Sequence, residues 1–512
     1  MKSIFRRPQI NSLIQTAQND RGGSKLKRTL GWWDVAVLGI SMSVGAGIFS
    51  VGATVIANYA GPASILSFLI AAVVISIAAM CYAEFASTLP VTGSAYTFAY
   101  STAGEIIAWI TGWSLILELF MGASVILKFW AVYLRDFLRL LGFSLPGQLT
   151  ITNTNIKIEW ICLVGALIFT LLLVLGTKLS TRVAAIFVVI KVLVVLFVIV
   201  MGLKYFNILN FQPFILPAEA TNQSTGSAGS SLFQTLIGQG GQTFGILGIF
   251  SGASVIAFAF LGFDNAATAA EETENPKRNM PLGLLAGIGI VSILYILMAI
   301  STAGMVKPSD YANYASTHPD STPSISTAFE ILGDNQTGAI ISFGAFLGLT
   351  TVVLVAMYSL SRTFFAISRD GLLPKSLYQT SKKFSTPAKL QIGIGVCIAL
   401  VASMTKVEIL AEMVNIGTLF AFIIVSFSIP KLRKIISTNK DMEIIQNETF
   451  KVPLSPILPI ISGLVCLWLA INLAVTTWII FVLWLILGLF IYLFYGYSHS
   501  NLNSSTSSQI TD

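Results

Sequence analysis

The chain has 512 residues, of which 55% are hydrophobic and only 10% are charged, and its mean hydropathy is +0.80. Soluble domains carry roughly 25% charged residues, so this composition excludes a soluble enzyme and indicates a membrane protein with many apolar helices. The net charge of +7 is therefore interpreted through membrane topology and not as a sign of nucleic-acid binding.

The chain begins with a polar, basic segment, residues 1–33, which has no signal-peptide pattern and is expected to be a cytoplasmic tail. Twelve apolar stretches follow, each suited to a membrane-crossing helix of about 20 residues. The first five run near 34–57, 63–88, 105–127, 159–176 and 183–203. The next five run near 246–270, 282–305, 337–367, 390–404 and 407–430, and the last two near 456–474 and 477–497.

These stretches form groups of five, five and two, which predicts an all-α membrane protein of twelve transmembrane helices. The first group covers 34–203, an extracellular connection covers 204–245, and the second group covers 246–430. A cytoplasmic loop, 431–455, precedes a helical hairpin, 456–497, and a Ser- and Thr-rich tail, 498–512, that we expect to be disordered and cytoplasmic.

The distribution of basic residues sets the expected orientation. Most of the 30 Lys and Arg residues fall on the inner side if the N-terminus is inside, so the positive-inside rule places both termini in the cytoplasm. Groups of five helices must then have opposite orientations. This predicts an inverted repeat, whose first helices in transporters are broken at the substrate site.

Cysteine and histidine residues give no metal or haem motif. The cysteines lie in apolar stretches without zinc-type spacing and are expected to be buried packing residues: Cys81, Cys162, Cys397 and Cys466. The two histidines, His318 and His499, lie outside the apolar stretches. We therefore expect neither a metal nor a cofactor.

The first apolar stretch contains a predicted break. Glycine favours helix poorly, so unwinding would present the N–H groups of Gly47 and Ile48 to a carboxylate at a positive helix end, and carbonyls before them to an ammonium. The predicted substrate-binding residues here are Ser43, Val44, Gly45, Ala46, Gly47 and Ile48. The alternative is close packing through small residues, although Gly45 and Gly47 lack the i,i+4 spacing that such packing uses.

The sixth stretch contains the matching break around Gly262, which is followed by Asp264, an acid rarely placed so deep in a plain packing helix. Unwinding would free the carbonyls of Phe258, Ala259 and Leu261 for a substrate ammonium, and the aromatic rings would shape a side-chain pocket. Ordinary packing of the phenylalanines is the alternative.

A set of motifs resembles a known family. The motifs are Gly31-Trp32-Trp33-Asp34, Gly45-Ala46-Gly47-Ile48-Phe49, Tyr82-Ala83-Glu84-Phe85, Pro90-Val91-Thr92-Gly93-Ser94, Gly262-Phe263-Asp264, Glu271-Glu272, Asn275-Pro276 and Ser368-Arg369-Asp370-Gly371. Over residues 30–430 the chain resembles the amino acid-polyamine-organocation superfamily, in particular the bacterial branch of the cationic amino acid transporter family. The resemblance implies a leucine-transporter-like fold. Longer eukaryotic relatives carry two more C-terminal helices, so the family name does not fix the substrate.

Lys191 lies near the midpoint of the fifth stretch. A lysine there costs about 2.5–3.5 kcal/mol on insertion scales and should face protein or water. Removal from water favours the neutral amine, so we predict a proton-coupling residue, with a purely structural lysine as the alternative. The resemblance implies that its ammonium meets carbonyls of the first helix, where sodium-coupled relatives hold sodium. A sodium site would instead use Thr350 or Thr351.

Two further residues bear on the substrate. Glu118 is another deep ionisable group and is expected to line the pocket, where it would pair with a cationic side chain or, protonated, serve a neutral one. A structural hydrogen-bonding role is the alternative. The resemblance places Leu349 near the end of the substrate side chain, where a bulky apolar residue favours small or medium neutral amino acids.

Possible gates lie near the helix ends. Glu84, Glu271 and Arg369 are expected near the inner ends, where ion pairs could latch an intracellular gate, and Phe263 is a further candidate. Solvated interfacial charge is the alternative. The segment Asn415-Ile416-Gly417-Thr418 either gates the outer vestibule or packs between helices.

The sequence therefore predicts a secondary active amino acid permease of the plasma membrane. An enzyme is not expected, because no nucleophile with a base nearby in the sequence lies in the apolar stretches. We expect proton symport of neutral L-amino acids, with an ion-independent exchanger or a cationic amino acid transporter as alternatives. The expected partners are a free amino acid, a proton and membrane lipid, a small membrane subunit being left open.

Overall fold

The computed structural model describes residues 29–45, 47–90, 94–143, 145–146, 149–150, 157–176, 181–220, 230–260, 262–318, 323–379, 381, 386–438 and 449–500. Much of the predicted tails, 1–28 and 501–512, and the loop residues 439–448 lie outside this description, as do Ala46, Leu261 and the side chain of Glu271.

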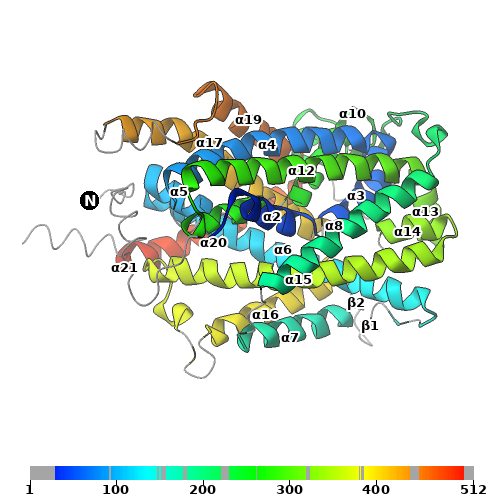
Figure 1. The fold of residues 1–512 in the computed structure, drawn as a ribbon, viewed down its shortest axis with the longest axis horizontal. Coiled ribbons are helices and arrows are strands. Elements are labelled where there is room, and N and C mark those ends of the chain that lie inside the picture. The colour runs from blue at the N-terminus through cyan, green and yellow to red at the C-terminus, as the bar shows by residue number, and fades with distance from the viewer. Residues whose placement is uncertain are drawn as a thin grey trace, which may run out of the picture.

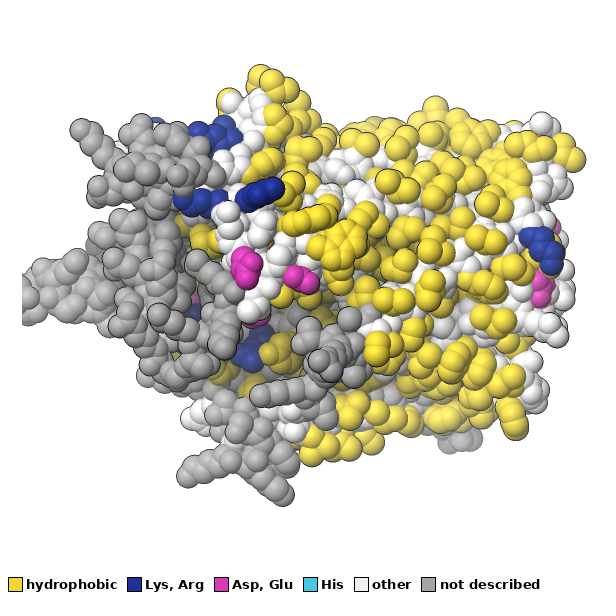
Figure 2. Space-filling view, in the orientation of Figure 1, with side chains coloured by type: hydrophobic (Ala, Val, Ile, Leu, Met, Phe, Trp, Pro, Cys, Tyr) yellow, Lys and Arg dark blue, Asp and Glu magenta, His cyan; other side chains and the backbone are white. Residues whose placement is uncertain are grey.

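Helices make up most of the described chain and run roughly along the longest axis of the molecule (Figure 1). Within the described residues, seven helical segments are long and apolar enough to cross a membrane, and shorter apolar helices accompany them. Apolar side chains are spread over the coloured part of the face in Figure 2, and charged side chains gather toward its two ends. Helices suit the hydrocarbon interior of a membrane because they satisfy their backbone polar groups by internal hydrogen bonds.

The first half of the chain forms the following elements: α2 Trp32–Ser43, η1 Gly47–Val51, α3 Gly52–Val55, η2 Ile56–Ala60, η3 Gly61–Ala63, α4 Ser64–Thr88, α5 Ser94–Thr102, α6 Glu105–Leu140, β1 Leu149–Thr150, β2 Lys157–Ile158, α7 Trp160–Val174 and α8 Thr181–Lys204. The connection contains η4 Ile208–Phe211, β3 Glu219–Ala220, α9 Leu232–Leu236 and β4 Gln242–Thr243.

The second half forms these elements: α10 Gly245–Ile256, η6 Ala257–Phe260, α11 Phe263–Ala266, η7 Ala267–Glu272, α12 Pro276–Met305, α13 Pro308–Thr317, α14 Ile325–Ile331, α15 Asn335–Arg369, η8 Lys375–Tyr378, α16 Ala388–Met404, α17 Val407–Thr438, α19 Ile457–Ile471, α20 Val475–Ile491, η9 Tyr492–Gly496 and α21 Tyr497–His499.

The molecule has two ends along its longest axis (Figure 1). We call them the α13 end, where α13, α14 and the β1–β2 pair lie, and the α5 end, where α5 and α21 lie. Helix α2 lies in the middle of the view, against α12 and close to α8. Its contact with α12 is tight: a Cβ added at Gly283 would lie 2.6 Å from the Trp32 carbonyl oxygen. The first broken segment is therefore enclosed by other helices.

The C-terminal hairpin is fixed to the long helix α6 by tryptophans. Trp113 donates from Nε1 to the carbonyl of Trp484 at 2.8 Å, and Trp484 donates back to the carbonyl of Trp113 at 3.0 Å. The two rings stack with centroids 4.6 Å apart. One turn away, Trp109 donates to the Gly488 carbonyl at 2.9 Å. Together these contacts join α20 to α6.

Two expectations from the sequence need correction. The fold is not purely helical, because β1 pairs with β2 and β3 pairs with β4, both antiparallel; strands of two residues are too short to show a periodic pattern. Cys397 is exposed, whereas the other three cysteines are buried as expected. It lies away from the face of α16 that is buried through Ile394 and Ile398.

Candidate functional site

The first broken segment unwinds where the glycines predict it. Helix α2 ends at Ser43, and Val44 leaves the helix with a ψ of 85°. The chain resumes a helical path at Gly47. A Cβ added at Gly47 would lie 2.1 Å from the Cα of Ala259, so no larger residue fits without moving backbone. Glycine is thus required by the close approach of the second broken segment.

The second broken segment mirrors this arrangement. Helix α10 ends at Ile256, the 3₁₀ turn η6 covers Ala257–Phe260, and Gly262 adopts a φ of +101°, which favours glycine. A Cβ added at Gly262 would lie 2.5 Å from the Cβ of Met42 on α2. The two breaks therefore pack directly on each other.

Backbone hydrogen bonds tie the broken segments together on both sides of the breaks. On one side of the breaks, Leu30 donates to the carbonyl of Glu272 at 3.1 Å, and Glu274 donates to that of Leu30 at 2.9 Å. Toward the α13 end, Phe244 donates to the carbonyl of Tyr59 at 2.8 Å. Since the start of one segment meets the end of the other in both places, the segments run in opposite directions.

Tyr295 of α12 bridges the two breaks, a role that the sequence analysis missed. Its hydroxyl lies 2.5 Å from the Ser43 carbonyl oxygen and 2.7 Å from that of Ala259. A tyrosine hydroxyl has one proton and donates to one of these carbonyls at a time. The ring is fully buried and packs edge-on against Phe68 and Phe260.

Lys191 reaches the first broken segment from α8. Its Nζ donates to the carbonyl of Ser41 at 2.6 Å, and the side chain is 1% exposed. Its stem lies against Gly348 of α15, where an added Cβ would come within 2.7 Å of the lysine Cγ. The amine is therefore held between α2 and α15 and bonded to a carbonyl close to the break.

The hydroxyls proposed for a sodium site are already engaged. Thr350 donates to the carbonyl of Phe346 at 2.9 Å and accepts from Trp130 Nε1 at 3.0 Å. Thr351 donates to the carbonyl of Gly348 at 2.9 Å.

The pocket residues predicted on α6 and α15 are buried. Glu118 is 1% exposed, and its carboxyl group lies near the Thr418 hydroxyl of α17. It lies against Gly417 of α17, where an added Cβ would come within 3.1 Å of its Cβ. Leu349 and Phe258 are also buried. Two residues before Gly417, Asn415 donates to the carbonyl of Val255, at the end of α10, at 3.1 Å.

The predicted gate residues do not form one cluster; each of those described has its own partner. Glu84 forms a bidentate pair with Arg433 of α17, at 2.7 and 2.8 Å, and accepts from the backbone N–H of Val452 at 2.6 Å. Arg433 lies 349 positions away in the chain, so the sequence analysis did not find it. Arg369 lies 3.9 Å from its neighbour Asp370. The ring of Phe263 packs against Phe422 of α17.

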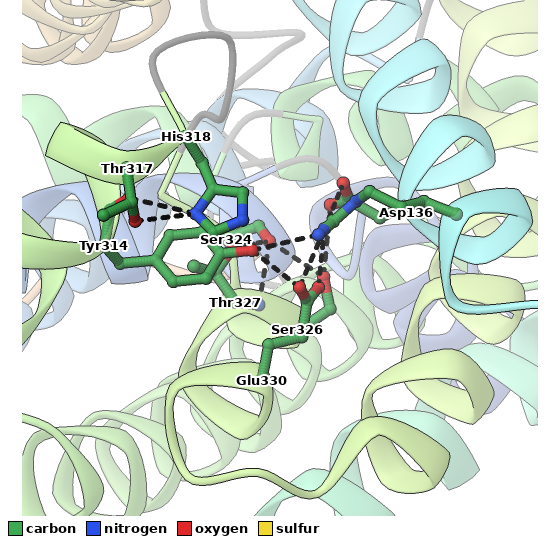
Figure 3. A network of polar contacts seen from close by, with 9 residues as sticks. Asp136, Tyr314, Thr317, His318, Ser324, Ser326, Thr327 and Glu330 are labelled. Atoms are coloured by element: carbon green, nitrogen blue, oxygen red, sulfur yellow. Dashed lines mark hydrogen bonds and ion pairs between the residues drawn. The ribbon is translucent and has the colours of Figure 1, made fainter. Parts of the chain in front are cut away.

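A second polar cluster lies at the α13 end (Figure 3). Arg139, near the end of α6, contacts Asp136 at 3.2 Å and Glu330 of α14 at 2.8 Å, and donates to the Tyr314 hydroxyl of α13 at 3.0 Å. Burial and a hydrogen bond to Glu330 raise the pKa of Tyr314 to about 12, so this phenol remains a donor at neutral pH. The cluster joins α13 and α14 to α6.

Comparison with known proteins identifies the class. Residues 30–490 match the family described as Amino acid permease, and the chain belongs to this family of the amino acid-polyamine-organocation superfamily. It is therefore an integral membrane permease and not an enzyme.

Individual relatives align with nearly the whole chain. It is 37% identical to the branched-chain amino acid permease BcaP of Bacillus subtilis, covering 98% of this chain and 99% of that protein. It is 34% identical to the methylthioribose transporter of the same organism, covering 98% and 100%. It is 30% identical to the vacuolar cationic amino acid transporter 4 of Arabidopsis thaliana, covering 99% and 97%.

Proposed function

We propose that this permease is a secondary active transporter that carries a neutral L-amino acid together with a proton across the plasma membrane by alternating access. The observation that carries the proposal is the meeting of two broken, oppositely directed segments, bridged by Tyr295 and contacted by Lys191. Broken helices at the interface of repeats provide substrate and ion sites in transporters.

The proposed architecture is a twelve-helix bundle with two inverted five-helix repeats and a C-terminal hairpin. Its support is the antiparallel run of the two broken segments and their hydrogen bonds on both sides of the breaks. The positive-inside distribution favours cytoplasmic termini. In this orientation the α5 end faces the cytoplasm and the α13 end faces outward.

The proposed substrate site uses backbone groups at the two breaks. The substrate ammonium would replace the Tyr295 hydroxyl as the hydrogen-bond donor to the carbonyls of Ser43 and Ala259. The N–H groups of Gly47 and Ile48 would bind the substrate carboxylate. The buried Leu349 and Phe258 favour an apolar substrate side chain. The BcaP relative is named for branched-chain amino acids, so leucine, isoleucine and valine are the preferred substrates.

Other residues complete this proposal. We assign the remaining members of the first break, Val44, Gly45 and Ala46, and Leu261 of the second break to the substrate site, with Glu118 beside it. Glu84, Glu271, Arg369 and Phe263 are assigned to the inner gate, where the pair of Glu84 with Arg433 supplies a contact between α4 and α17.

Coupling follows from the hydrogen bond of Lys191. A charged donor contributes about 1.5–3 kcal/mol to a hydrogen bond, compared with about 0.5–1.5 kcal/mol for a neutral one. Loss of the proton would weaken the tie between α8 and the Ser41 carbonyl. Protonation and the position of α2 would then depend on each other, which is the requirement for coupled transport.

The test is uptake into proteoliposomes with an imposed inward proton gradient and without one. The panel contains labelled leucine, isoleucine, valine, arginine, lysine and methylthioribose, because a full-length relative is named for the last compound. Gradient-driven accumulation of a branched-chain amino acid, lost in Lys191→Ala while exchange persists, is the expected result. Uptake that requires internal amino acid and ignores the gradient would identify an exchanger and refute proton symport.

A further inference from the structure

A cavity of about 440 Å³ lies at the α13 end, separate from the two breaks. This volume is within the range of about 300–1,000 Å³ that small-molecule sites occupy. Its walls come from η2 and η3, from η4, β3 and the connection between them, from β4, and from the start of α13. Segments far apart in the sequence therefore meet around one space.

The lining combines charges of both signs with amides and apolar groups. Glu219 of β3 and Lys307, which precedes α13, both line the cavity. Within the described residues neither side chain forms an ion pair, so a bound molecule can use both charges. Asn58 and Gln212 offer amide groups, and Leu216 contributes apolar surface.

These features suit a free zwitterionic amino acid. Lys307 matches a carboxylate, Glu219 matches an ammonium, and an apolar wall accommodates a side chain. Both charged side chains are exposed to water, so an uncharged solute would gain nothing from either, and an inorganic ion would pair with only one of them.

The cavity also touches both broken segments beyond their breaks. Asn58 belongs to the first segment, and Phe244 directly precedes α10 of the second. Beside the cavity, Phe244 donates to the carbonyl of Tyr59, and Gly245 donates to that of Leu216 at 3.0 Å. The connection thus lies across both segments, and separation of the segments would break up the walls of the cavity.

We propose that this cavity is a second amino acid site, which binds a zwitterionic amino acid from the outside and holds the outer ends of the broken segments closed. The inference rests on the proposed transport function and adds a regulatory site to it. A ligand that binds only the closed arrangement shifts the population toward that arrangement. High external amino acid concentrations should therefore slow uptake.

The experiment measures initial uptake of labelled L-leucine by proteoliposomes over external concentrations from below KM to about 100 times KM. Coupling between two sites is usually about 5- to 150-fold, so we expect the wild-type rate to pass through a maximum and then fall at least about fivefold. The double variant Glu219→Gln/Lys307→Gln should follow a simple saturation curve with an unchanged KM.

The matched control is Asp310→Asn, which removes a charge next to the cavity from a residue that caps α13 through the Lys307 N–H. It should retain the fall in rate. Equilibrium binding to purified protein should give two leucine molecules per chain in the wild type and one in the double variant. Uncharged N-acetyl-L-leucinamide should not cause the fall.

Two results would overturn the inference: a wild-type rate that saturates without falling, or a fall that persists in the double variant. Both results leave leucine uptake at low concentration intact and therefore leave the proposed function standing. Absence of any leucine uptake or binding at low concentration is a different result, which would count against the proposed function itself.

Discussion

Replacing Tyr295 by phenylalanine tests whether the two breaks are held together by a single hydroxyl. The change removes the group that lies 2.5 Å from the Ser43 carbonyl and 2.7 Å from the Ala259 carbonyl. The ring contacts with Phe68 and Phe260 are kept. The variant lacks the hydroxyl proton that lies between the two buried carbonyl oxygens, so one of them loses its donor. A buried polar group without a hydrogen-bond partner costs about 1–3 kcal/mol of free energy.

We expect this cost to fall on the arrangement described here, which we take as the closed one, because in it both carbonyls face the hydroxyl. At about 1.4 kcal/mol per factor of ten, the ratio of closed to open protein should fall by about 5- to 150-fold. We expect the rate of leucine uptake to fall by a similar factor, with little change in the Tm of the purified protein. Uptake kinetics and thermal unfolding in detergent measure the two quantities.

The matched control is Tyr82→Phe, which removes a buried hydroxyl that has no hydrogen-bond partner among the described residues. The substitution keeps the edge-on contact of the ring with Phe98. It should transport at the wild-type rate. If Tyr295→Phe also transports with wild-type kcat and KM, the hydroxyl does not stabilise the closed arrangement and the reasoning fails.

Three further variants probe the contacts around the site. Gly47→Ala should abolish uptake, because its Cβ would lie 2.1 Å from backbone of the second segment, whereas Gly289→Ala, with no atom within 4 Å of the added Cβ, should transport normally. Arg433→Gln should lower the stability by about 3 kcal/mol, since it leaves Glu84 buried without its cation, and a lower Tm checks this. Arg139→Gln should increase hydrogen exchange in α13 and α14, which that arginine joins to α6.

Each of these has its own contrary result. Normal uptake by Gly47→Ala would show that the breaks separate easily. The double variant Glu84→Gln/Arg433→Gln should recover most of the lost stability, and failure to do so would assign the loss to packing. The control is Arg362→Gln, because among the described residues Arg362 donates only within α15, to the Tyr358 hydroxyl one turn away. Equal hydrogen exchange of α13 and α14 in Arg139→Gln and Arg362→Gln would show that the cluster at the α13 end does not hold these helices.

The sequence predicted the positions of the breaks because glycine acts locally. Gly47 and Gly262 mark places where the backbone leaves the helix, and that departure depends on residues adjacent in the chain. Lys191 could likewise be located near the bilayer centre from its apolar neighbours alone. Its particular partner, the Ser41 carbonyl, depends on how α8 crosses α2 and had no local signal.

Tyr295 shows why the rest could not be predicted. It stands in an ordinary apolar helix, where a tyrosine is expected to pack, and its two acceptors lie 252 and 36 residues away. Arg433 is similar, since its position after a long apolar stretch is typical of a solvated interfacial charge. In both cases the informative fact is a crossing of helices, which one sequence does not contain.

The reciprocal tryptophan bonds between α6 and α20 make the C-terminal hairpin a fixed point of reference. A fluorophore or spin label on α20 is expected to keep its distance to α6 throughout the transport cycle. Distances measured from that label to α2 or α10 would then report the displacement of the broken segments alone. The hairpin thus provides a fixed internal reference from which the opening of either end of the molecule can be measured.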